Sequence, residues 1–216
     1  MDYNNIDEVI DTIKEKCYVD HDIKGAVKMV EDSPEGLRND KNFFRKLRMR
    51  LEFGFSNFCK CIGEELSNDE DFILEMAQGE GNNLSCASEQ LRGNREFMER
   101  ACTILDPRYV VANASPELKG SKDFILMALD NTDEGWLITS ADEKLFDDED
   151  VRKVISEKYD GQRVLDRMEA IKEETKRREQ LQQKKAERDA LQAKAQEYTE
   201  LEGTIDSLNQ KQEEQK

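Results

Sequence analysis

The sequence has few of the residues from which catalytic and metal sites are usually built. Its 216 residues contain one histidine, His21, and five cysteines. A structural zinc site needs four Cys or His ligands, usually in closely spaced pairs, and the lone C-x-C of Cys59 and Cys61 does not supply them. Five cysteines without framework spacing favour packed thiols in a reducing compartment. We therefore expect a cytoplasmic protein without a metal site.

Proline and glycine are scarce, with three and 11 residues, which favours helices. The mean hydropathy is −0.87 and no run of about 20 apolar residues occurs, so we expect no membrane span. The acidic N-terminal segment MDYNNIDEVID does not resemble a signal peptide. P-loop, G-x-G-x-x-G, G-x-S-x-G and H-E-x-x-H motifs are absent. We expect a protein that is not an enzyme and binds no cofactor.

Basic residues are the minority, with 33 against 49 acidic residues. Residues 161–216 hold 12 basic and 13 acidic residues, which leaves a balance of −15 in residues 1–160. Such a field repels phosphate backbones, so we expect no direct nucleic-acid binding. The acidity either attracts a basic protein partner or only keeps the chain dissolved.

An internal repeat organises residues 37–160. Five similar segments begin at leucines spaced 29, 25, 27 and 27 residues apart, and they read LRNDKNFF, LSNDEDFI, LRGNREFM, LKGSKDFI and LFDDEDVR. These five leading leucines are Leu37, Leu66, Leu91, Leu118 and Leu145. Four units also end alike, in CIGEEL, CASEQL, NASPEL and SADEKL. A repeat of this length is typical of stacked helical units.

The columns of the repeat predict helices. Each unit has a helix-capping residue three positions after its leucine, and an apolar anchor follows three positions later. The capping column is Asp40, Asp69, Asn94, Ser121 and Asp148. The anchor column is Phe43, Phe72, Phe97, Phe124 and Val151. Acidic residues around the caps, including the runs at 68–71 and 147–150, favour a helix start, and DDEDVRKVISEK lacks the glycine of a calcium loop.

A variable connector and a second short helix complete the earlier units, and in the fifth unit the long C-terminal segment takes the place of the second helix. Because two short helices cannot bury their apolar faces alone, neighbouring units must stack. We therefore predict an all-α fold, an α-solenoid-like array of short two-helix repeats with a long C-terminal helix. The expected domains are an N-terminal helical cap at 1–36, the array at 37–160 and a charged helix at 161–216.

The C-terminal segment lacks proline and is rich in Glu, Lys, Gln, Arg and Ala, which favour a helix. Its apolar positions approximate a coiled-coil seam near both ends, but the seam nearly vanishes between residues 172 and 190. A dimeric coiled coil and a single solvated helix both fit this pattern. A helix that docks on a partner is a third alternative.

The repeated units resemble the DUF4116 repeat family over roughly residues 37–155. NDEDFILEMA…LSCASEQL and GSKDFILMAL…ITSADEKL carry the resemblance best. The sequence departs from the pattern at Gly93, Gly120 and Val151. Because the family has no known function, the resemblance implies a helical array and no catalytic residues.

We expect a protein–protein interaction module with an acidic repeat surface and a tail that oligomerises, as in a homodimer, or docks on a partner. The alternative is an acidic inhibitor that occupies the basic nucleic-acid channel of an enzyme. An enzyme of unrecognised type is a third hypothesis. Aromatic residues at equivalent connectors and apolar residues of the tail are the candidate partner contacts. They are Phe55, Tyr109, Trp136, Tyr198, Leu201 and Ile205.

Overall fold

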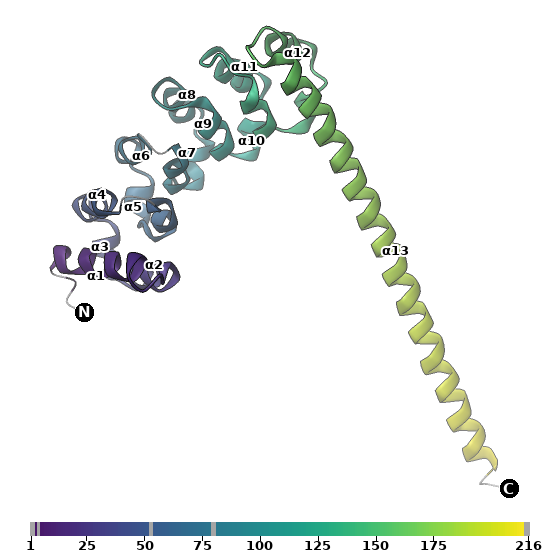
Figure 1. Cartoon of the computed structure of the whole chain (residues 1–216). Coiled ribbons are helices and arrows are strands. Elements are labelled where there is room, and N and C mark those ends of the chain that lie inside the picture. Colours follow the sequence, from purple (N-terminus) through teal and green to yellow (C-terminus); the bar gives the residue numbers. More distant parts are fainter. Residues whose placement is uncertain (1–2, 4, 52–53, 79–80, 214–216) are drawn as a thin grey trace. The chain divides into compact units, whose positions relative to one another are not determined.

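Helices are the only regular elements among the residues that the computed structural model describes, which are 3, 5–51, 54–78 and 81–213 (Figure 1). The predicted all-α fold with a long C-terminal helix is therefore confirmed. The chain divides into two compact units, residues 1–167 and 168–216. No helix in the described parts of the chain is long and apolar enough to cross a membrane.

Two helices form the N-terminal end, α1 (Ile6–Tyr18) and α2 (Ile23–Glu31). Each has a capping side chain, Asn5 and Asp22 respectively, that accepts a hydrogen bond from a backbone N–H in the first turn. Each helix buries one apolar stripe apart from its first residue, since Ile6 is half-buried and Ile23 is 46% exposed. The buried residues are Val9, Ile10 and Ile13 of α1 and Ala26, Val27 and Val30 of α2.

Each of the first four repeats contains a one-turn helix, a main helix and a second short element, whereas the fifth contains a one-turn element and a main helix only. The one-turn helices are α3 (Glu35–Arg38), α5 (Glu64–Ser67), α7 (Glu89–Gly93), α10 (Pro116–Lys119) and the 3₁₀ turn η4 (Glu143–Leu145). The main helices are α4 (Lys41–Arg50), α6 (Glu70–Ala77), α8 (Arg95–Ile104), α11 (Lys122–Asp130) and α12 (Glu149–Ser156). The second elements are η1 (Phe55–Cys61), η2 (Gly81–Cys86), α9 (Pro107–Asn113) and η3 (Trp136–Ser140). The leading leucines therefore lie in a helical turn of their own, which the sequence did not reveal.

The predicted columns explain how the main helices form. Asp40, Asp69, Asn94 and Asp148 accept hydrogen bonds from backbone N–H groups two or three residues ahead. Ser121 holds the same position without a side-chain capping bond. All five anchors are at most 1% exposed, and the leading leucines are at most 8% exposed. Caps start each helix and anchors bury it, as the repeat predicted.

The repeats stack with the main helices next to one another. Helices α4, α6, α8, α11 and α12 contact each other in that order, and Figure 1 shows α5, α7 and α10 in a second row along the same unit. This second row is joined by main-chain hydrogen bonds at equivalent positions. The residue three before a leading leucine donates its N–H to the carbonyl of the residue after the previous leading leucine. The bonds are Gly63 to Arg38 (2.7 Å), Ser88 to Ser67 (2.9 Å), Ser115 to Arg92 (2.9 Å) and Asp142 to Lys119 (3.0 Å).

Helix α13 (Gly161–Glu213) starts within the first compact unit. Its Val164 is fully buried, and a methyl group built on Gly135 of the η3 connector would lie 3.5 Å from Val164. Trp136 Nε1 donates to Asp160 Oδ2 at 3.3 Å, and the Arg163 guanidinium lies over the Trp136 ring at 5.9 Å. These contacts anchor the first turn of α13 on the last repeat. From Lys176 to Gln196 every side chain of the helix is exposed.

Candidate functional site

Ion pairs between repeats occupy the exposed face of the main helices. Each pair joins a basic side chain on one main helix to a carboxylate on, or capping, a neighbouring main helix. The pairs are Lys41–Asp69 (2.5 Å), Arg45–Glu75 (2.6 Å), Arg100–Glu70 (2.9 Å), Lys122–Asp148 (3.0 Å) and Lys122–Asp150 (2.6 Å). Exposed pairs of this kind contribute little individually. They do, however, neutralise many of the carboxylates on this face.

The pKa values of these carboxyl groups follow from their contacts. The Lys41 ammonium lowers the pKa of Asp69 most, and the N–H of Phe72 lowers it further. The Arg45 guanidinium lowers the pKa of Glu75 in the same way. Both carboxylates therefore serve the fold, one as a cap and both as inter-repeat partners.

A different set of carboxylates has no ion-pair partner in the described part of the chain. These side chains lie on the one-turn helices α3, α5, α7 and α10, and all of them are exposed. We call them the acidic edge, and they are Glu35, Glu64, Glu65, Glu89 and Glu117. The first, second and fourth stand two residues before a leading leucine, so the sequence held the signal for this row. The row was not recognised in the sequence because the acidic residues were interpreted as residues that favour helix starts.

A groove interrupts the acidic edge between α7 and α10. It has a volume of about 510 Å³ and is lined by Glu89, Arg92, Gly93, Ala114, Ser115, Pro116 and Glu117. The buried Nε atom of Arg92 has no hydrogen-bond partner in the described structure. Burial lowers the pKa of Lys119 on α10, and the charge of Arg92 lowers it further. Cations therefore lie beside exposed acids here, and the groove presents both signs of charge.

The predicted aromatic row does not form one surface. Phe55 is 1% exposed and packs edge-on against Phe44, with ring centroids 6.4 Å apart. It is a core residue, because the 3₁₀ turn of η1 directs it into the stack, and we do not retain it as a partner contact. Trp136 of η3 is partly buried and contacts the start of α13. Tyr109, at 39% exposure, remains accessible on α9.

The candidate residues of the tail all lie in α13. Leu201 is 53% exposed. The side chains of Tyr198 and Ile205 lie outside the described residues. Their role as partner contacts stays a prediction.

Two of the five cysteines are not the free thiols that we expected. Cys59 of η1 and Cys86 of η2 form a disulfide between neighbouring repeats. They are 27 residues apart, close to the repeat period, so stacking places them together. Cys61 and Cys102 are buried thiols, and burial raises their pKa values to about 11 and about 12. Such thiols are protonated and inert at neutral pH.

A metal site is absent from the described residues, where no three His, Cys, Asp or Glu side chains gather to hold an ion. The acidic runs at 68–71 and 147–150 instead place Asp69 and Asp148 as helix caps. Residues of these two runs therefore act as helix caps and as ion-pair partners between repeats.

Comparison with known proteins supports the predicted repeats over part of the array. No curated protein and no solved structure matches the chain. Residues 69–119, which extend from the cap of α6 to the end of α10, match a family model, and this span lies inside the range of 37–155 in which we saw the resemblance. Residues 69–119 are therefore similar to DUF4116, a domain of unknown function.

Proposed function

We propose that this protein is a non-enzymatic interaction module whose acidic edge binds a basic protein or peptide. The observation that carries the proposal is the division of carboxylates between two faces. Several of those on the main helices pair with neighbouring repeats, whereas those of the acidic edge are all exposed and have no ion-pair partner within the described structure. Unpaired charges on a repeat array are available to a partner of opposite sign.

The arrangement of charges along the acidic edge suits an extended or helical partner. At least one of its carboxylates lies on each of four successive one-turn helices, which main-chain hydrogen bonds join to one another. A row of recurring charges suits a partner whose own cations recur along its length. The exposed Tyr109 and the tail helix offer further contacts.

The proposal is tested with the full chain and a lysine- and arginine-rich peptide as probe. We expect Glu65→Gln, Glu89→Gln and Glu117→Gln together to weaken binding about tenfold, because three exposed charges each contribute a fraction of a kcal/mol. Fluorescence anisotropy at low and high salt measures the affinity.

The matched control removes three other exposed carboxylates, by Glu96→Gln, Asp123→Asn and Glu149→Gln at the starts of α8, α11 and α12. It has the same net charge as the triple glutamine variant of the acidic edge. If the position of the charges matters, it should bind the peptide nearly as well as the wild type. Equal loss in both variants would reduce the effect to overall acidity and refute a specific edge.

The cytoplasmic location expected from the cysteine content stays a proposal. Mass spectrometry of protein isolated under acid quench would show whether Cys59 and Cys86 are reduced in the cell. A predominantly intact disulfide would contradict this location, because reducing compartments keep such pairs as thiols.

A further inference from the structure

Charge is segregated around the middle of helix α13. Residues 176–188 contain six basic and two acidic residues, in contrast to the acidic array. Five of the six basic residues surround Leu181 at spacings of three, four or seven residues, which place them on one helical face. We call this face the cationic stripe, and it consists of Arg177, Arg178, Leu181, Lys184, Lys185 and Arg188.

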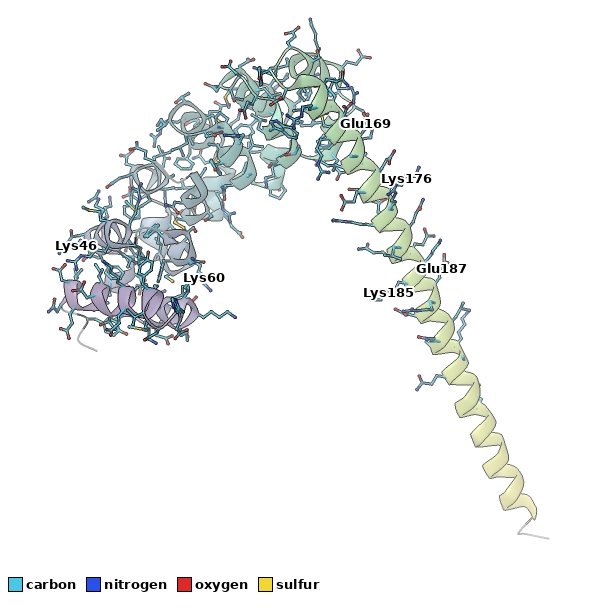
Figure 2. All side chains as sticks on the ribbon, in the orientation of Figure 1. Lys46, Lys60, Glu169, Lys176, Lys185 and Glu187 are labelled. Carbon is cyan, nitrogen blue, oxygen red and sulfur yellow. A yellow bond between two sulfur atoms is a disulfide. The ribbon has the colours of Figure 1, made fainter. Side chains whose placement is uncertain are left out.

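The stripe has the properties of an uncovered contact surface. Leu181 is 70% exposed, and it lines a shallow hollow of about 360 Å³ with Lys184, Lys185 and Arg188. Lys184 and Lys185 have no ion-pair partner among the described residues. The opposite side of the helix has both signs of charge, since Figure 2 shows Lys176 and Glu187 on the side away from Lys185.

We propose that the cationic stripe docks on the acidic edge of a second copy of this chain. This inference rests on the proposed function, because it takes the acidic edge as a surface that binds basic segments. The complementary charge is present in the chain itself: unpaired lysines on the stripe and unpaired carboxylates on the edge. A nucleic acid or an anionic membrane is a poorer partner, since the array that accompanies the stripe has a charge balance of −15 and repels both.

The lengths of the two surfaces match. From residue 177 to residue 188 a helix rises about 17 Å at about 1.5 Å per residue. Neighbouring packed helices lie about 8–10 Å apart, so three successive repeats extend over about 16–20 Å. The stripe therefore reaches the acids of α5, α7 and α10 together. Leu181 at its centre would lie over the groove between α7 and α10, whose lining includes Ala114 and Pro116.

Charge reversal in the full chain tests this docking. The stripe variant has Lys184→Glu and Lys185→Glu, and the edge variant has Glu89→Lys and Glu117→Lys. We expect the wild type to self-associate at low ionic strength and to dissociate near 1 M salt, where the Debye length is about 3 Å. Each variant alone should associate at least about tenfold more weakly, and an equimolar mixture of the two should regain association because opposite charges face each other again. Sedimentation velocity measures all of these states.

The control variant reverses two lysines on the opposite side of the helix, by Lys176→Glu and Lys194→Glu. It has the same net charge as the stripe variant and should associate like the wild type. A monomeric wild type at low salt, self-association that the stripe variant retains, or a mixture that stays dissociated would each overturn the proposal. So would binding of the monomeric chain to phosphatidylserine vesicles through the stripe.

The two proposals fail separately. If the wild type stays monomeric at low salt while it and the stripe variant both bind the lysine- and arginine-rich peptide, the acidic edge keeps its function and only the docking is wrong. If the edge variant binds that peptide as well as the wild type does, the proposed function itself is wrong.

Discussion

At the scale of single residues, the anchors of the repeat determine most of the core. Phe43, Phe72, Phe97 and Phe124 occur at one position of successive units, and each is almost completely buried. Because the interior is closely packed, the loss of one ring leaves a cavity that the neighbours fill only in part.

Replacing Phe97 by Ala should lower the free energy of unfolding by about 3–5 kcal/mol, because a fully buried phenylalanine is removed from the middle of the array. Urea denaturation followed by circular dichroism measures the change. Tyr109→Ala is the control, since this aromatic side chain is 39% exposed and its loss should have a much smaller effect. A loss below about 1 kcal/mol at Phe97 would contradict its role as an anchor.

At the scale of elements, each main helix depends on its cap and on its pairing with the next helix. Asp69 does both, since it accepts a hydrogen bond from the N–H of Phe72 and pairs with Lys41 of the previous repeat. Ser121 holds the same position in α11 without a side-chain capping bond. Comparing substitutions at these two equivalent positions therefore shows how much stability depends on the bonds that the Asp69 side chain makes.

Asp69→Ala should destabilise the protein by about 1 kcal/mol, the usual effect of losing a capping side chain, whereas Ser121→Ala should have little effect. The pKa of Asp69 is lowered in the folded protein, so its contribution is present above about pH 4 and is lost as the pH falls through the folded value. Urea denaturation at neutral pH and near pH 2 measures both. A difference between wild type and Asp69→Ala that stays constant down to pH 2 would contradict this linkage.

The elements also show what sequence reasoning could and could not predict. Caps and anchors recur at fixed positions, so the main helices and their stacking followed from the repeat. The one-turn helices did not, because four residues show no periodicity. The disulfide was missed since Cys59 occupies the apolar column of Leu84, Val111 and Ile138, where a packed thiol is the natural interpretation. The acidic edge and the cationic stripe require knowledge of which carboxylates and lysines are paired, and pairing is a property of the folded chain.

At the scale of the whole molecule, the start of α13 belongs to the folded body of the first compact unit. Val164 is fully buried, and Arg163 covers the ring of Trp136. The charged segment that follows has an exposed surface from Lys176 onward in the described residues.

A chain that ends after Glu174 should unfold with the same midpoint as the full chain, because the side chains beyond it that the structure describes bury little surface. A chain that ends after Asp160 should lose about 1.5–3 kcal/mol, since it lacks the fully buried side chain of Val164. Differential scanning calorimetry of both fragments distinguishes these outcomes. Equal stability of the two fragments would place the boundary of the array before Gly161 after all.

The hydrogen bonds that join Arg38 to Gly63, Ser67 to Ser88, Arg92 to Ser115 and Lys119 to Asp142 involve only main-chain atoms. Any residue except proline can donate such a bond, and every residue can accept one. Evolution can therefore exchange the side chains on this edge, or duplicate and delete whole repeats, without losing the alignment of one repeat on the next. Paralogues of this chain could differ in binding specificity through substitutions along a single edge, while the hydrophobic columns beneath it stay the same.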